Sequence, residues 1–169
     1  MNASNLKNPE QYDEFVLALQ KILIRFAIKM DSCLVAEEDG HIVAAAILQH
    51  QTVSMLNNLQ NGAIKLFRFI SIIRLFKYFN FVEESERNLE DSAEYDWYLM
   101  MLSVTPDYQR KGIGSRFLLE GVEPFVGSTG GHSLGLITNR DYNVPFYEKN
   151  GYKQCGYKVL TYEIHKLGN

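Results

Sequence analysis

The chain reads WYLMMLSV at 97–104 and TPDYQRKGIGSRF at 105–117, and the junction between these two stretches decides the fold. The first stretch is a continuous apolar run of strand length, which is typical of a strand buried on both faces. The second is a polar loop that leads into a helix expected at about 112–126. The first N–H groups of a helix lack intrahelical acceptors and carry partial positive charge, so this junction predicts an anion-binding site.

The chain after this helix alternates between element types. A glycine-rich turn, a strand near 133–138 and a short helix around 144–149 are expected in that order. A strand, a helix and a second strand at this spacing predict a right-handed crossover, in which strands 97–104 and 133–138 are parallel. Two further segments, 152–157 and 159–165, carry alternating large side chains and are expected to complete the sheet.

The N-terminal part predicts a helix and a β-hairpin. Asn8, a following proline and Gln11 have the pattern of a capped helix start, and apolar residues then recur at three- and four-residue steps through 12–30. The segment 33–48 contains two apolar runs separated by an Asp-Gly pair at 39–40. This pair readily takes the positive φ angles of a type I′ turn, so we expect a hairpin there.

The segment 53–88 has a helical pattern, and its part 63–82 is rich in Leu, Phe and Ile. A basic amphipathic helix can bind a membrane or a partner, although a core helix with a solvated face is the interpretation we favour. A possible homodimer could share this apolar helix. Seven carboxylates follow between Glu83 and Asp96, in what is most simply a solvated linker. The cations on the 63–82 helix are Lys65, Arg68, Arg74 and Lys77.

Composition limits the classes of function. The 169 residues, 46% hydrophobic and 22% charged, predict one globular domain over 1–169. A formal charge of −3 gives no general attraction to nucleic acid. Cys33 and Cys155 lie far apart and form no metal-binding pattern, so we expect no metal site and a reducing, cytoplasmic setting. The chain has no signal-peptide pattern and no apolar run of about 18 residues, so we expect no integral membrane contact.

Two phosphate-binding motifs are excluded by single positions. The third glycine of a dinucleotide-binding fingerprint would fall at Phe117, whose side chain is too large for that role. A Walker A loop needs a lysine directly after its second glycine, and Ser115 stands after Gly114.

The segment QRKGIG at 109–114, placed after a buried strand, is similar to the Q/R-x-x-G-x-G/A signature of the GNAT superfamily of N-acetyltransferases. NVPFYEKNGY at 143–152 resembles the second motif of that family, and the spacing between the two motifs also matches. The hairpin at 33–48 resembles the family's second and third strands, whereas no first strand is evident before Asn8. The resemblance covers the chain closely from Trp97 onward.

This resemblance implies an α/β fold with a mixed, mostly antiparallel sheet, a splayed parallel strand pair and flanking helices. It also implies an enzyme that moves an acetyl group from acetyl-CoA, its cosubstrate, to a primary amine of a small molecule or peptide. The amine would attack directly in a ternary complex. Because acceptor specificity depends on shape and loop contacts, no local motif identifies the amine.

The resemblance further implies a site. Backbone groups of 102–104 would pair with the pantetheine arm, and N–H groups of 110–115 would hold the pyrophosphate. Asn143 would bind pantetheine or fix the start of the next helix, and Tyr147 would donate a proton to the leaving thiolate. The residues assigned to acetyl-CoA are Leu102, Ser103, Val104, Gln109, Arg110, Lys111, Gly112, Ile113, Gly114, Ser115, Asn143 and Tyr147.

A general base is harder to assign. The family often carries a Glu or Asp in the middle of the strand, but residues 99–101 are Leu, Met and Met. Glu94 and Asp96, at the start of the strand, are the nearest carboxylates. His41 and His132 are expected at the surface or in turns. Water could also deprotonate the amine while the enzyme aligns it with the thioester.

Two other classes of function remain as alternatives. Gly131 to Gly135 match G-x-S-x-G, and Asp141 and His165 follow Ser133 in the order of an α/β-hydrolase triad. That motif needs a strand before the serine and a helix after it, whereas here a turn precedes and a strand is expected to follow. The second alternative is a non-catalytic acyl-CoA-binding or interaction module, which the apolar middle of the strand 97–104 favours.

Overall fold

The computed structural model describes residues 9–50, 94–138 and 140–156, together with eight single residues between the first two ranges. The expected helix cap at Asn8, most of the segment 53–88 and the expected strand at 159–165 lie outside the described residues. The eight are Leu66, Arg68, Phe69, Ser71, Ile73, Lys77, Asn80 and Glu84. The helices are α1 (Tyr12–Lys29), α4 (Ile113–Phe117), α5 (Glu123–Ser128) and α6 (Val144–Lys149), and the strands are β1 (Cys33–Glu38), β2 (His41–His50), β3 (Trp97–Val104) and β4 (Leu134–Leu136).

The described strands form one four-stranded sheet in the order β1-β2-β3-β4. β1 pairs with β2 and β2 with β3 in antiparallel directions, whereas β3 and β4 are parallel. The mixed, mostly antiparallel sheet and its parallel pair are therefore confirmed. The hairpin turn has positive φ angles at Asp39 (52°) and Gly40 (77°), as a type I′ turn requires.

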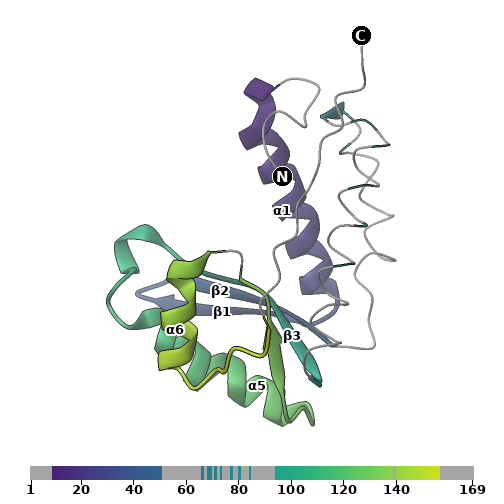
Figure 1. The fold of residues 1–169 in the computed structure, drawn as a ribbon. Coiled ribbons are helices and arrows are strands. Elements are labelled where there is room, and N and C mark those ends of the chain that lie inside the picture. The colour runs from purple at the N-terminus through teal and green to yellow at the C-terminus, as the bar shows by residue number, and fades with distance from the viewer. Residues whose placement is uncertain are drawn as a thin grey trace.

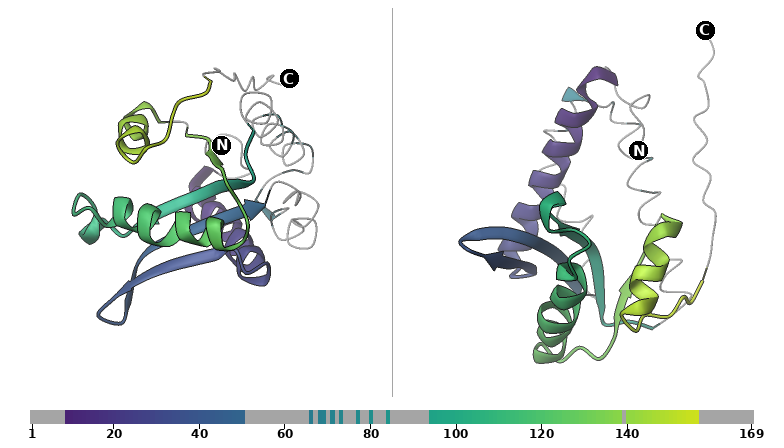
Figure 2. Two further views of the ribbon diagram at one scale, coloured as in Figure 1. Left: turned by 90° about the horizontal axis from the view of Figure 1, so that it is seen from below. Right: turned by 90° about the vertical axis from the view of Figure 1, so that its left-hand side faces the viewer.

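The helices cover both faces of this sheet (Figures 1 and 2). Near its C-terminal end α1 packs on one face, where Ala27 and Ile47 are fully buried. On the other face lies one helical segment made of α4, a π-helical turn at Leu118–Val122, and α5. α1 begins at Tyr12 after a 3-10 turn, and the side chain of Gln11 makes no capping hydrogen bond.

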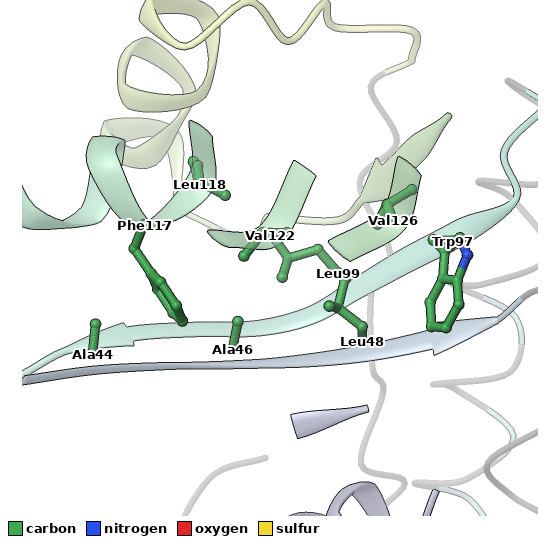
Figure 3. Close-up of a cluster of buried hydrophobic side chains, with 9 residues drawn as sticks. All are labelled: Ala44, Ala46, Leu48, Trp97, Leu99, Phe117, Leu118, Val122 and Val126. Atoms are coloured by element: carbon green, nitrogen blue, oxygen red, sulfur yellow. The ribbon is translucent and has the colours of Figure 1, made fainter. Parts of the chain in front are cut away.

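The larger core lies between the sheet and the helical segment 113–128 (Figure 3). Small side chains at Ala44 and Ala46 on β2 leave room for the ring of Phe117. Leu118 and Val122 are fully buried, and each such side chain contributes roughly 1.5–3 kcal/mol to folding. This burial fixes the helix on the sheet, so the loop between β3 and α4 is anchored at both ends.

A β-bulge interrupts β3. Ile47 of β2 is opposite Met101, and the next residue, Leu48, is opposite Leu99, so Met100 has no partner on β2. The parallel ladder with β4 covers only Trp97 to Leu99 and ends next to the bulge. Because a bulge bends and twists its strand, the two strands part at this point.

The structure corrects the boundaries of two sequence predictions. β4 is Leu134–Leu136, shorter than the expected 133–138, because β3 turns away after Leu99. Residues 152–156 form no strand in the structure, so the prediction of a strand at 152–157 is wrong over these residues. Alternating large side chains are insufficient for a strand where no neighbouring strand offers hydrogen bonds.

Gly131→Ala is expected to destabilise the protein by about 1–3 kcal/mol, the usual range for an overfilled core. An added Cβ would lie 2.5 Å from Cδ1 of Trp97 and 2.8 Å from Cγ1 of Val126. Gly127→Ala is the matched control, because an added Cβ there meets nothing within 4 Å. Urea denaturation gives the free energy of unfolding of both variants. Wild-type stability of Gly131→Ala would contradict this packing.

Candidate functional site

The loop that follows β3 is fastened to the end of the sheet. The backbone N–H and the side-chain hydroxyl of Thr105 both donate to the carbonyl of Val43, at 2.9 and 3.3 Å. The Gln109 side chain donates to the carbonyl of Val104 at 2.9 Å. Gln109, which the resemblance assigned to acetyl-CoA, therefore has a structural bond that ties the loop to β3.

The same loop presents a row of backbone N–H groups. Arg110 and Gly112 have positive φ angles of 59° and 81°, and Gly112 immediately precedes α4. Among the described residues, the N–H groups of 110–115 donate to no backbone carbonyl, and the first bond of the helix runs from Arg116 N–H to Gly112 at 3.0 Å. Backbone N–H groups that converge in such turns form a concave anion site. This geometry fits a phosphate group.

Gly112 and Gly114 serve different physical purposes. An added Cβ at Gly112 would meet nothing within 4 Å, so this glycine is needed for its left-handed backbone and not for space. An added Cβ at Gly114 would lie 3.3 Å from Cζ of Phe146 and 3.5 Å from Cγ2 of Val104. Gly114 therefore lets α4 approach α6 and β3 closely. Gly114, which the resemblance assigned to acetyl-CoA, thus also has a packing role.

Past the bulge, one edge of β3 lacks a partner strand in the described sheet. The N–H of Thr105 donates to Val43 of β2. In an antiparallel ladder, successive residues direct their N–H and C=O groups alternately toward and away from the neighbouring strand. The backbone groups of Val104 and Leu102 therefore point away from β2. Ser103 lies at the intervening position and directs its groups toward Ala45. Leu102 and the N–H of Val104 therefore offer an open strand edge, whereas the Val104 carbonyl accepts from Gln109 and Ser103 faces β2.

The basic side chains of the loop are exposed. Arg110 and Lys111 both lie at the surface, and the Lys111 ammonium is 5.3 Å from the ring centroid of Tyr108. An anion held by the backbone of this loop would lie close to two cations. Ile113 and Ser115 are half-buried, and the side chain of Ile113 packs against the core.

A short connection that ends in a 3-10 turn at Asp141–Asn143 joins β4 to α6, and Asn143 is bonded across it. The Asn143 side chain donates to the hydroxyl of Thr138 at 3.1 Å, and its backbone N–H donates to Arg140 at 2.9 Å. Of the two expected roles of Asn143, this bond supports the one that fixes the start of the helix. α6 spans Val144–Lys149, which confirms the short helix expected there.

Tyr147 lies in the middle of α6, between two other aromatic rings. Its ring centroid is 5.1 Å from that of Phe146 and 5.7 Å from that of Tyr152, both in edge-to-face arrangements. Burial raises the pKa of the Tyr147 phenol above its usual value. The phenol therefore stays protonated at neutral pH, as a proton donor must.

Asp96 lies at the opposite end of β3 from this loop, where it organises the start of β4. Its carboxylate accepts the backbone N–H of His132 at 2.6 Å, and the N–H and hydroxyl of Ser133 at 3.0 and 3.2 Å. The bond from His132 N–H, followed by those from Ser133, lowers the pKa of Asp96. A carboxylate with a lowered pKa and three donors is a weak base, so these contacts make Asp96 a structural residue.

Glu94, the second candidate base, is exposed and lies two residues before Asp96. Both precede the eight residues of β3, so they lie about 26 Å from the loop at the far end of that strand. His41 and His132 are exposed, as expected. The structure thus brings together the N–H groups of 110–115, the open edge of β3 and α6, but neither Glu94 nor Asp96.

The structure does not support Ser133 as the nucleophile of a hydrolase. The Ser133 hydroxyl donates to Asp96 and also accepts the Asp96 N–H at 3.0 Å, so it is held between two groups of the same residue. A turn precedes Ser133 and the strand β4 follows it, which is the reverse of a nucleophile elbow. His165, the proposed base of the triad, lies outside the described residues.

The described part of the chain shows neither a metal centre nor a membrane-spanning helix. Within that part, no three His, Cys, Asp or Glu side chains gather where they could hold a metal ion. Cys33 is half-buried and Cys155 is exposed, and both are free thiols. No described helix has the length and hydropathy needed to span a membrane.

Two features of the site, a bulge in β3 and a contact between α6 and α4, have no signal in the sequence. The bulge at Met100 occurs inside a uniformly apolar run, where no residue marks an extra position. The contact of Phe146 with Gly114 joins residues 32 positions apart. Each of the two segments had a recognisable motif, but only the folded chain shows that they touch.

The chain was compared with known families and solved structures. A model of the acetyltransferase (GNAT) family matches residues 3–152. An agmatine N-acetyltransferase is similar, with a TM-score of 0.56 and 18% identity over 79% of this chain and 64% of that chain. An aminoglycoside antibiotic 6'-N-acetyltransferase from Acinetobacter haemolyticus gives a TM-score of 0.52 and 11% identity, over 88% and 81% of the two chains. An aminoglycoside N-acetyltransferase in complex with CoA gives 0.50 and 12%, over 94% and 97%. At such identities, the structures establish a shared fold alone.

Asp96→Asn is expected to lower the melting temperature at neutral pH, because a neutral amide is a weaker acceptor than a carboxylate for three donors. The pKa of Asp96 is lowered in the folded state, so its stabilisation is present above the unfolded pKa of about 3.9 and is lost as the pH falls through the folded value. The difference from wild type should therefore shrink below about pH 4.

Circular dichroism melts of wild type, Asp96→Asn and Glu94→Gln across this pH range measure the effect. Glu94→Gln is the matched control, with an expected change within about 0.5 kcal/mol at an exposed position. An Asp96→Asn protein that melts like wild type at every pH would show that the three bonds contribute nothing to stability.

Proposed function

Because this chain belongs to the acetyltransferase (GNAT) family, we propose that it transfers the acetyl group of acetyl-CoA to a primary amine of a small molecule or peptide. The amine attacks the thioester directly in a ternary complex. The observation that carries this proposal is the junction after β3, where N–H groups of 110–115 that donate to no described backbone carbonyl adjoin the open strand edge at Leu102 and the Val104 N–H. Polar groups for phosphates and for amides therefore follow one another along the chain.

The residues of this junction suit the parts of acetyl-CoA. The pyrophosphate would accept bonds from the loop N–H groups, and Arg110 and Lys111 would offset its charge. The amides of the pantetheine arm would pair with Leu102 and with the N–H of Val104 as an added strand, beside the Gln109 side chain that holds the Val104 carbonyl. Such an extension directs the thioester along β3, from the loop toward the bulge at Met100.

Tyr147 is the proposed proton donor. When the amine attacks the carbonyl carbon and the C–S bond breaks, the phenol gives its proton to the sulfur, and the phenolate is then reprotonated from water. The raised pKa keeps the phenol protonated until it is needed. The rings of Phe146 and Tyr152 restrict its orientation. Asn143 would hold the start of α6 through Thr138.

No carboxylate is proposed as general base. The middle of β3 is apolar at 99–101, and Asp96 is engaged with the backbone at the start of β4. We therefore propose that water takes the proton of the amine and that the enzyme contributes mainly by alignment. Effective alignment can account for about 7–11 kcal/mol of a barrier, so a base is not essential.

The acceptor is proposed to be a cationic amine. Glu84 and Glu94 are exposed members of the acidic run 83–96, and such a run raises the local concentration of cations. Enzymes of similar fold are an agmatine N-acetyltransferase and aminoglycoside N-acetyltransferases. Agmatine, linear polyamines and aminoglycosides are therefore the first amines to test. Free thiols at both cysteines agree with activity in the cytoplasm.

The second candidate is a non-catalytic module that binds acyl-CoA. The absence of a carboxylate at 99–101 favours it, whereas Tyr147 with its raised pKa favours an enzyme. Release of free thiol from acetyl-CoA across the amine panel decides between them. Thiol release that depends on an amine and yields the N-acetyl product supports the enzyme. Tight acetyl-CoA binding without amine-dependent release supports the module.

Gly114→Val is expected to weaken acetyl-CoA binding at least about tenfold, which corresponds to about 1.4 kcal/mol. Its side chain would push α4 away from Phe146 and Val104 and so displace the loop N–H groups. Isothermal titration calorimetry measures the effect, and Gly127→Val, in the last turn of the same helical segment, is the control because its Cβ meets nothing within 4 Å. Normal binding by Gly114→Val would remove the loop from the acetyl-CoA site.

Tyr147→Phe is expected to lower kcat about 100-fold with little change in acetyl-CoA affinity, because the proton is needed only as the thiolate leaves. In the wild type, kcat should not decline through loss of this proton until the pH exceeds the usual tyrosine value of about 10. Stopped-flow thiol release, under conditions where chemistry limits the rate, measures both effects. Unchanged kcat in the variant would leave Tyr147 with a packing role only.

A further inference from the structure

Tyr152 stands directly after the turn that ends α6. Gly151 has a φ angle of 90°, and its N–H donates to Glu148 at 3.0 Å. The N–H of Tyr152 donates to the carbonyl of Tyr147 at 3.1 Å. These two bonds form a Schellman motif, in which the residue after the left-handed glycine folds back onto the last full turn of the helix.

The motif brings two side chains together. A Schellman motif is often accompanied by an apolar contact between the same two positions, and here both are tyrosines. The rings of Tyr147 and Tyr152 meet edge to face, with centroids 5.7 Å apart and planes at 69°. Phe146 meets Tyr147 from another side at 5.1 Å. Tyr152 therefore contacts both the backbone carbonyl and the ring of Tyr147.

The hydroxyl of Tyr152 takes no part in this contact. Its oxygen is buried and makes no hydrogen bond among the residues that the structure describes. Burial above all raises the pKa of Tyr152 far above its usual value, and the nearby Glu123 carboxylate and the Tyr147 phenol raise it further. The polar neighbour of the hydroxyl is Glu123 outside α6, whereas the ring contacts Tyr147, so the ring is what this position contributes to the orientation of Tyr147.

We propose that Tyr152 is a positioning residue for the reaction, and that its ring and N–H fix the orientation of Tyr147 so that the phenol faces the leaving sulfur. This inference rests on the proposed function, in which Tyr147 is the proton donor. The phenol must reach its hydrogen-bond position before the thiolate leaves, and a ring free to rotate would spend only part of its time there.

The ring of Tyr152 is expected to affect kcat, whereas its hydroxyl is not. Tyr152→Phe keeps the ring and the backbone bond, and is expected to retain kcat within about twofold. Tyr152→Leu keeps an apolar side chain but removes the flat edge, and is expected to lower kcat about tenfold, with KM for acetyl-CoA within about twofold. Melting temperatures of both variants show whether either has lost its fold.

A comparison of two acyl donors distinguishes positioning from general packing. Each protein is assayed with acetyl-CoA and with an aryl acetyl thioester, using the amine of the panel that gives the fastest release. An aryl thiolate leaves without a proton, so loss of proton donation lowers the rate with acetyl-CoA and spares the aryl donor. The ratio of the two rates in one preparation does not depend on how much of the enzyme is folded.

We expect Tyr152→Leu and Tyr147→Phe to lower this ratio together, with Tyr152→Phe close to wild type. An equal loss with both donors in Tyr152→Leu, while Tyr147→Phe shows the selective loss, would overturn the inference and leave the proposed function intact. A Tyr152→Leu protein with the wild-type ratio would also overturn it. No amine-dependent release by the wild type would overturn the proposed function and this inference with it.

Discussion

The parallel pairing of β3 with β4 covers only Trp97 to Leu99, and the arrangement of the site depends on where it stops. The extra residue Met100 shifts the register of β3 against β2 at this point, and β3 continues without β4 as its neighbour. An open edge inside a sheet normally favours unwanted pairing, and proteins rarely leave one without a use. Here the open edge leads directly to the loop that presents N–H groups.

The closed end of the pair is fixed by contacts of a different kind. Asp96 binds the N–H groups of His132 and Ser133, so β4 begins in register with β3. Gly131 allows the preceding turn to pass against Trp97, where no side chain would fit. β3 therefore has one end where hydrogen bonds to β4 stabilise the fold, and one end where the strand edge is open. This division explains why the nearest carboxylate to the middle of β3 is a structural residue.

α6 connects the two sequence motifs in space. Phe146 packs on Gly114, so the helix with the proposed proton donor touches α4, which follows the loop proposed to bind phosphate. At its other end, Gly151 and Tyr152 close the helix on Tyr147. The proposed phosphate site and the proposed proton donor would thus depend on contacts of the same helix. A substitution of Gly114 or Gly151 would therefore alter both the loop before α4 and the position of Tyr147.

The sequence by itself determined the family and most of the described elements, but not the short extent of β4 or the lack of a strand at 152–156. The apolar run at 97–104, the Asp-Gly turn and the two motifs at 109–114 and 143–152 are local signals, and each depends on neighbouring residues alone. Only the tertiary structure decided that Asp96 is bonded to β4, that the bulge falls at Met100 and that Gly114 meets Phe146. These features arise between segments far apart in the chain, where register and packing are set by the whole fold.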